Sequence, residues 1–249
     1  MTNDTIHFIT NEFSRGISQN EEWWKYRLSL YKHFTLNSII NQTNKNFYLL
    51  MTIDDRFRNT HYEDIVSILN DSGLKYFVID RTKKDDLRKV LEPIIKDFDY
   101  VYTTRIDTDD VFRNDVVEEI QKHNYEYKQA LFYQKGYCYD IDNKKLQHYY
   151  AQFPPFATLM FPKEVFLDDD KRNEYIGVQS HDILIRTFKP IYLQENKYIV
   201  IIHKNNLASV YLEGNEARFR QRFEIQSSEH DRILKEFGFD SKTYEKYFR

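Results

Sequence analysis

The stretch YVYTTRIDTDDVF (residues 100–112) joins a β-rich run to a group of carboxylates. Aromatic and β-branched residues fill Tyr100–Thr104, which is typical of a strand. Asp107, Asp109 and Asp110 follow at once. In an extended chain, residues two apart face the same side, so Asp107 and Asp109 can present both carboxylates to one point. Paired carboxylates suit Mg2+ or Mn2+, which prefer oxygen ligands and leave positions open for phosphate oxygens.

Three similar runs precede this one, and each leads through a polar joint into an apolar pattern of helical period. The runs are Ile6–Thr10, Phe47–Ile53 and Tyr76–Ile79, and the helical patterns cover residues 23–40, 62–69 and 87–95. Pro93 should kink or shorten the third helix. Strand–helix alternation predicts a parallel sheet with right-handed crossovers, whose ligands bind beyond the carboxyl ends of the strands.

Carboxylates and arginines occur at each of these strand exits, where a structural loop could have used only Ser, Gly or Asn. The polar joints are Asn11-Glu12 with Ser14-Arg15-Gly16 after the first run, Asp54-Asp55-Arg56 after the second, Asp80-Arg81 after the third, and Arg105 to Asp110 after the fourth. We therefore expect a site for a charged ligand at this edge of the sheet.

The pattern changes after residue 115 and predicts a mixed or antiparallel second half. The expected elements are a helix at Asp115–His123, a hairpin of Ala130–Tyr139 with Leu146–Tyr150, an apolar run at Phe156–Phe161, a helix at His181–Phe188, a strand at Tyr198–Ile202 and a charged helical tail from about Glu216. The prediction is a single α/β domain with a mixed sheet, flanking helices and a smaller antiparallel portion.

Composition excludes several classes of protein. The 249 residues carry 36 Lys and Arg against 39 Asp and Glu, a net charge of −3, so overall charge does not suggest a nucleic-acid partner. Cys138 is the only cysteine, which excludes an intramolecular disulfide and a cysteine-based zinc cluster. No apolar run approaches the ~18 residues that span a bilayer. We expect a soluble, cytoplasmic protein.

The carboxylate motif also has structural readings. Asp109 or Asp110 could cap a helix that starts near Asn114. Asp140 and Asp142 have the same spacing, but they lie in the turn of the expected hairpin. A calcium loop of the EF-hand type is excluded, because the required glycine and terminal glutamate are missing.

Four segments carry a family resemblance: HFITNEFSRG (7–16), NSIINQTNKNFYLLMTIDD (37–55), YTTRIDTDDVF (102–112) and YIVIIHKNN (198–206). They resemble nucleotide-sugar glycosyltransferases of the GT-A fold, and more narrowly the rhamnosyltransferase group, over about residues 5–210. The resemblance implies a GT-A-like domain at 1–210. Its nucleotide-binding half would cover about 1–115 and its acceptor half about 116–210, with 211–249 a C-terminal helical segment packed on it.

The resemblance also implies roles for individual residues. Asp107 would contact the nucleotide ribose or the metal, Asp109 would bind the divalent ion, and His203 would complete the metal or diphosphate site. A lone histidine after a strand is as often structural. The remaining donor-binding residues would be Asp54 with its neighbour Asp55 at the base, and Arg15, Arg81 and Arg105 around the nucleotide or its phosphates.

Asp182 resembles the base that takes the proton from the acceptor hydroxyl in inverting members. The family's acidic pair appears here as His181-Asp182, so the role of His181 is open, and Ser180 or Asp182 could instead cap the helix. The expected enzyme is a metal-dependent, inverting glycosyltransferase that uses Mn2+ or Mg2+, a nucleotide-diphosphate sugar as donor and a surface polysaccharide as acceptor.

Two other functions remain open. One is a phage-type enzyme that glycosylates hydroxymethylated bases in DNA, for which basic clusters at residues 83–89 and 218–222 could hold phosphates. The other is a non-catalytic nucleotide- or carbohydrate-binding module. The sequence does not identify the sugar, the nucleotide or the oligomeric state, nor the roles of Asp110 and of the C-terminal segment.

Overall fold

A computed structural model describes residues 4–13, 20–53, 55–80, 84–153, 156–177, 181–206 and 209–248. For residues 55–60, 80, 84–86, 181 and 182 it describes the backbone only.

The first half of the chain forms the predicted parallel sheet. β1 (Thr5–Phe13) lies between β2 (Tyr48–Ile53) and β4 (Tyr100–Arg105), and β3 (Tyr76–Asp80) pairs with the outer edge of β2, all in parallel. These four strands belong to a seven-stranded sheet of order β10-β6-β9-β4-β1-β2-β3. Their burial on both faces explains the nearly unbroken apolar runs in the sequence. The prediction of the fold class is confirmed.

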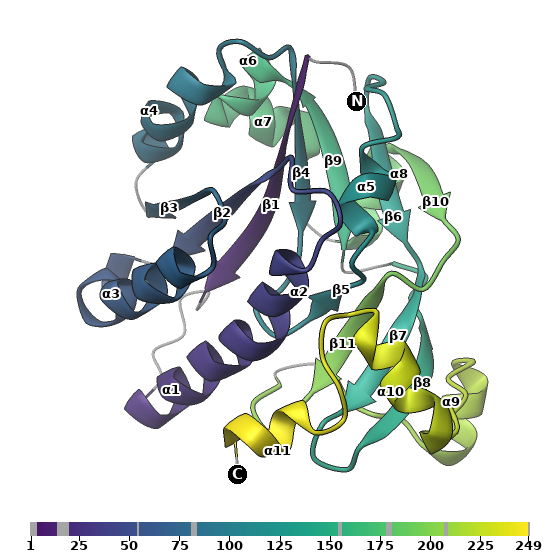
Figure 1. Cartoon of the computed structure of the whole chain (residues 1–249). Helices are drawn as coiled ribbons and strands as arrows, with labels where there is room; N and C mark the ends of the chain where they lie inside the picture. The colour runs from purple at the N-terminus through teal and green to yellow at the C-terminus, as the bar shows by residue number, and fades with distance from the viewer. Residues whose placement is uncertain are drawn as a thin grey trace.

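Helices cover both faces of this sheet (Figure 1). One face packs against α1 (Glu21–Leu30), a π-helical turn (Tyr31–Thr35), α2 (Leu36–Ile40), α3 (Asp55–Asp71) and α5 (Val116–Ile120). The other packs against α4 (Lys84–Ile95), α6 (Lys163–Phe166), α7 (Asp169–Ile176) and α8 (His181–Thr187). Pro93 lies inside α4, and the helix ends two residues later.

The far end of the large sheet is mixed. β9 (Ala157–Pro162) runs antiparallel to both β4 and β6 (Gln129–Tyr133), and β10 (Lys189–Leu193) pairs in parallel with β6. Because Thr104 lies opposite Thr158, β9 begins at the sheet edge where β4 ends. The chain entering β9 is therefore brought beside the Asp107–Asp110 turn.

A second sheet has four strands in the order β5-β11-β7-β8. They are β5 (Val111–Phe112), β11 (Tyr198–Ile202), β7 (Lys135–Asp140) and β8 (Lys145–Tyr150). The β7–β8 hairpin was predicted, but a single strand over residues 130–139 was wrong. That run divides at Gln134 into β6 and β7, in different sheets. Gly136 makes the close packing possible, since a Cβ there would lie 2.6 Å from the Tyr198 ring.

The C-terminal segment is helical and contributes to a third apolar cluster. It contains α9 (Gly214–Phe219), α10 (Ser227–Lys235) and α11 (Thr243–Phe248). Ile233, Leu234 and Phe237 pack with side chains of α1 and β11. Gly238, at φ +87°, reverses the chain after α10, and its carbonyl accepts a hydrogen bond from the Asn37 side chain. The predicted division at residue 210 stays a prediction. No helix in the described ranges is both long and apolar enough to cross a bilayer.

Candidate functional site

The site lies where β1 and β4 end, as the polar strand exits predict. The chain leaving β4 is anchored to β1 on both sides of Ile106. The Ile106 N–H donates to the Thr10 carbonyl (3.0 Å), and the Ile106 carbonyl accepts from the Asn11 side chain (2.8 Å). Beyond this anchor the chain turns, and the Asp110 N–H donates to the Asp107 carbonyl over 3.3 Å. The aspartates therefore lie on a turn, not on an extended strand.

Asp109 lies in a buried ionic cluster. Its Oδ2 accepts a hydrogen bond from Arg27 Nη1 of α1 (2.5 Å) and another from His203 Nε2 (3.1 Å), just beyond β11. Arg27 Nη2 donates to the Thr108 hydroxyl (3.1 Å). The side chains of Arg27 and Asp109 are only 11% and 16% exposed. Burial alone would raise the pKa of Asp109, but the charge of Arg27 and the two hydrogen bonds lower it, so the carboxylate stays ionised.

The hydrogen bonds of His203 define its tautomer. Nδ1 accepts from the Asn205 N–H (3.2 Å), so the proton of the neutral ring is on Nε2 and is donated to Asp109. Burial lowers the pKa of His203 despite the bond to Asp109, which favours this neutral form. Arg27 Nη1 lies 3.1 Å from His203 Nε2. Because both nitrogens then carry protons, this is a close contact between two donors and not a hydrogen bond. The protonated Nε2 has no lone pair for a metal.

Asp107 differs from Asp109 in exposure. Its Oδ1 accepts from Arg105 Nη2 (2.7 Å), and the two side chains are 40% and 42% exposed. A pair this open to solvent is screened and contributes little to stability. Asp107 and Arg105 are therefore accessible to a charged ligand.

Asp110 ties the turn to the second sheet. Its Oδ1 accepts from the Ile201 N–H over 3.0 Å, and the residue is buried. Burial, together with the charges of Asp109 and Asp107, raises the pKa of Asp110 well above its usual range. Asp110 thus fixes β11, and with it His203, against the turn. It does not cap the following helix, as one reading of the sequence allowed.

The donor set fits a divalent cation only in part. Within the described ranges, no three His, Cys, Asp or Glu side chains gather where they could hold a metal. Arg27 and His203 already occupy Asp109 Oδ2. Mg2+ bound with phosphates, however, needs only one or two carboxylates. Asp107 meets that requirement, whereas a closed centre of Asp107, Asp109 and His203 does not form here.

Several predicted residues are not placed. Arg15, Asp54 and Arg81 lie outside the described residues. Asp55 begins α3 and Asp182 is the second residue of α8, but their side chains are not described. The predicted roles of these five residues stay predictions.

Arg27 is the site residue that the sequence did not reveal. It is one of two basic residues on α1, and its hydrogen-bond partners Thr108 and Asp109 lie 81 and 82 residues away along the chain. Its Nε is buried and has no hydrogen-bond partner among the described residues. A buried donor left in this state is costly unless an acceptor reaches it.

Comparison with known proteins gives a family match over residues 9–210, to the model described as "Putative rhamnosyl transferase". No curated protein sequence matches the chain.

Among solved structures, residues 1–349 of S. aureus TarS in complex with UDP-GlcNAc align at 11% identity and a TM-score of 0.48, covering 83% of this chain and 62% of that one. The same fragment with UDP gives 12% identity and a TM-score of 0.45, covering 79% and 60%. Mouse xyloside xylosyltransferase 1 gives 11% identity and a TM-score of 0.33, covering 53% and 52%. This chain thus spans about three fifths of the TarS fragment.

Proposed function

This chain belongs to the rhamnosyl transferase family. From that premise we propose that it is a glycosyltransferase that moves a sugar from a nucleotide-diphosphate donor to a hydroxyl group, with inversion. The observation that carries the donor assignment is the exposed Arg105–Asp107 pair, at the carboxyl end of β4 in a parallel sheet. Such edges bind nucleotides and other phosphorylated ligands.

The reaction is a displacement at the anomeric carbon. The acceptor oxygen forms a bond to that carbon from the face opposite the diphosphate, while the bond from carbon to the diphosphate oxygen breaks. Asp182, as the proposed base, takes the proton from the acceptor hydroxyl. This assignment rests on the family pattern at the start of α8.

The departing diphosphate needs positive charge near it. Arg105 is exposed beside Asp107 and can supply this charge, whereas the charge of Arg27 is already paired with Asp109. A Mn2+ or Mg2+ ion, held by Asp107 together with donor phosphates, would stabilise the developing charge. We assign Asp109 and His203 to the support of the turn rather than to direct metal binding, because Asp109 Oδ2 accepts from both Arg27 and His203, and the His203 Nε2 proton is used in that bond.

The test combines ligand-induced stabilisation with turnover. UDP-, GDP-, CMP- and dTDP-linked sugars are screened by thermal shift with and without Mn2+, because a ligand that binds the native state raises its Tm. We expect one nucleotide class to raise the Tm and to be hydrolysed slowly. Asp107→Asn should lose about tenfold or more in turnover, because it removes the accessible carboxylate.

Asp142→Asn is the matched control, because Asp142 has the same aspartate spacing but is exposed in the β7–β8 turn. It should behave as wild type. Full turnover by Asp107→Asn, or no response to any nucleotide sugar, would contradict the proposal. Direct calorimetry of Mn2+ with wild type and Asp107→Asn separates loss of the cation from loss of the donor.

A further inference from the structure

A groove of about 420 Å³ lies beside the second sheet, between the end of β8 and the turn that follows α9. One wall is Tyr149–Phe153 and the other is Phe219–Arg222. We call it the aromatic–arginine groove. Its walls are held together by backbone hydrogen bonds, from the His148 N–H to the Phe223 carbonyl (2.9 Å) and from the Ile225 N–H to the Leu146 carbonyl (2.8 Å). The groove is therefore built into the fold.

The groove connects to the candidate active site through the buried core of the second sheet, because Tyr149 of the groove packs edge-on against Tyr198 (6.1 Å between ring centroids). β9, which follows the groove wall in sequence, begins at the sheet edge where β4 ends. Phe156, at the start of this passage, packs edge-on against Phe112 (5.7 Å between ring centroids) and Tyr198 (4.8 Å). Phe112 follows two residues after Asp110. These rings are buried, so an acceptor held in the groove has to be long enough to reach the Asp107–Asp110 turn over the surface.

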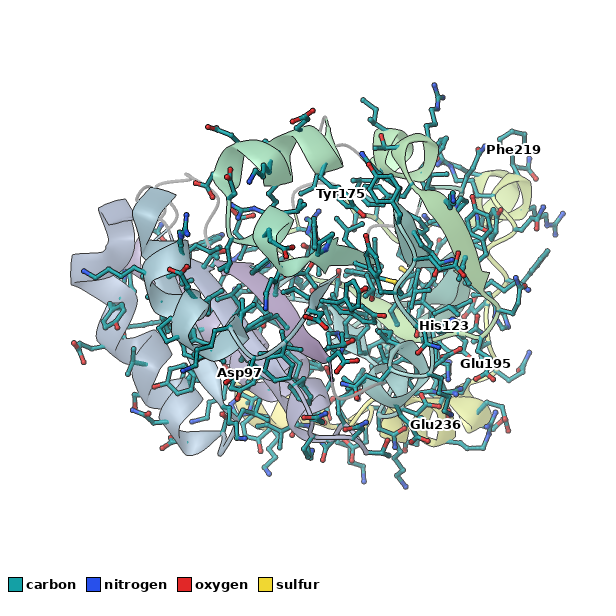
Figure 2. The ribbon with its side chains drawn as sticks, turned by 90° about the horizontal axis from the view of Figure 1, so that it is seen from above. Asp97, His123, Tyr175, Glu195, Phe219 and Glu236 are labelled. Atoms are coloured by element: carbon teal, nitrogen blue, oxygen red, sulfur yellow. The ribbon has the colours of Figure 1, made fainter. Side chains whose placement is uncertain are left out.

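Aromatic rings are unusually exposed here. Phe219 is 87% exposed, Tyr150 42% and Phe153 39%, and Figure 2 shows Phe219 at the outer rim of the molecule. Large apolar side chains that group together on a surface often mark a binding site, whereas single scattered ones do not. Flat rings offer contact area to sugar rings and to bases alike, so they do not by themselves identify the ligand.

The charge of the groove indicates which class of ligand it binds. The described lining includes Arg220 and Arg222 but no carboxylate. Arg222 is fixed, because its guanidinium lies 4.2 Å above the Tyr149 ring and donates to the Val210 carbonyl (3.1 Å). The Arg220 side chain is 59% exposed, and its nearest ion-pair partner, Glu216, is 3.9 Å away and itself exposed. Gln221 between them adopts φ +57°, an uncommon conformation for a residue other than glycine.

We propose that the aromatic–arginine groove docks the acceptor, and that this acceptor is an acidic glycan whose rings contact the aromatic side chains while its anionic groups bind Arg220 and Arg222. The inference rests on the proposed function, which requires a hydroxyl-bearing acceptor beside the donor. An arginine fork matches carboxylate and phosphate equally well. Duplex DNA is disfavoured, because two arginines neutralise few phosphates and the chain's net charge is −3.

The test measures binding of the full chain, without donor, to immobilised polymers by biolayer interferometry at physiological ionic strength. The probes are polygalacturonate, with carboxylates, phosphomannan, with phosphates, dextran, which is neutral, and a short DNA duplex. We expect one or both acidic glycans to bind more tightly than dextran and DNA. Arg220→Gln and Phe219→Ala should each weaken that binding about tenfold or more, the effect of losing one charge-assisted contact or one aromatic anchor.

Matched controls come from outside the groove. Arg232→Gln removes an exposed arginine of α10, and Tyr127→Ala removes an aromatic residue that is 64% exposed. Both should bind as wild type. Thermal melts establish that Arg220→Gln and Phe219→Ala are folded, as their exposure predicts.

The proposal is overturned if neither acidic glycan binds better than dextran, if the two groove variants bind as wild type, or if DNA binds at least as tightly as the glycans. The two arms with acidic glycans distinguish carboxylate from phosphate recognition. Because binding is measured without donor, this test is independent of glycosyl transfer. Failure of the groove proposal would appear as absent glycan binding, whereas failure of the proposed function would appear as absent turnover by wild type with every donor.

Discussion

Arg27 determines which aspartate of the turn can face a ligand. It is the only cation within hydrogen-bonding distance of Asp109 among the described residues, and it also binds Thr108. A buried ion pair is weak evidence of net stabilisation, but removing one partner leaves the other charge buried and unpaired. Arg27 therefore holds the turn in one conformation, in which Asp107 stays accessible.

We predict that Arg27→Gln lowers the free energy of unfolding by about 3–5 kcal/mol, because the Asp109 carboxylate would lose its buried cation. Arg27→Lys should cost less, since it keeps the charge but cannot bind Asp109 and Thr108 with one planar group. Urea denaturation measures both. The control Arg88→Gln breaks an exposed pair with Glu92 and should cost under about 1 kcal/mol. Equal stability of Arg27→Gln and wild type would contradict the role assigned to Arg27.

Asp107, Asp109 and Arg27 show which features of the site the sequence could not predict. Asp107 and Asp109 were expected to converge because alternate residues of an extended chain share a side. The chain stops being extended after Arg105, however, and the turn gives the two carboxylates separate partners. Spacing identified the motif, but not its geometry. Arg27 could not be found, because it meets Asp109 only through the packing of α1 beside the turn.

Strands and helices were easier to predict than contacts. Four buried strands appeared as short apolar runs between polar joints, and β11 was predicted with the bounds that the structure has. The division between β6 and β7 was missed although Gln134 and the exposed Lys135 interrupt the buried pattern, because the residues before and after this break suit one continuous strand. Only tertiary packing decides that they enter different sheets.

At the scale of elements, a hydrogen-bond chain joins the strands beneath the site to α5 and its C-terminal end. Gln121 donates to His7 Nδ1 (3.2 Å), so the neutral ring of His7 carries its proton on Nε2 and donates it to Thr104 (2.7 Å). The Thr104 and Thr158 hydroxyls are 2.7 Å apart and continue the chain from β4 to β9. Burial lowers the pKa of His7 to about 3.

The buried neutral ring of His7 predicts that the protein loses stability in acid. The pKa of His7 falls from about 6.5 in the unfolded chain to about 3 in the fold, so the folded state resists protonation. The contribution of His7 is complete above pH ~6.5 and declines as the pH falls toward ~3, by up to about 1.4 kcal/mol per pH unit. Urea titrations between these limits should show a shallower decline for His7→Gln.

His148→Gln is the control, because its side chain lies on an exposed part of β8. It should retain the pH dependence of wild type. If His7→Gln loses stability in acid as steeply as wild type, other groups determine the pH dependence of the free energy of unfolding, and the buried neutral ring of His7 does not cause it.

At the scale of the whole molecule, three apolar clusters hold the chain together, and the third reaches beyond the family match, which ends at residue 210. Figure 1 shows α10 and α11 beside the second sheet. Leu234 and Phe237 of this segment share the cluster with Leu30, Phe34 and Ile201. Because β11 leads into His203, the C-terminal segment supports one wall of the site.

Leu234→Ala tests whether this segment folds as part of the same unit. Leu234 is fully buried, so its truncation should cost about 2–5 kcal/mol, through lost burial and the cavity left behind. The loss should lower a single cooperative melting transition, since Leu234 packs with α1 and β11 rather than with the C-terminal helices alone. Lys235→Ala, at the exposed neighbouring position, should leave the transition unchanged. A separate early transition in Leu234→Ala, with the main transition at the temperature of wild type, would instead make the segment an independent unit, and the support it gives to β11 and His203 would then be absent.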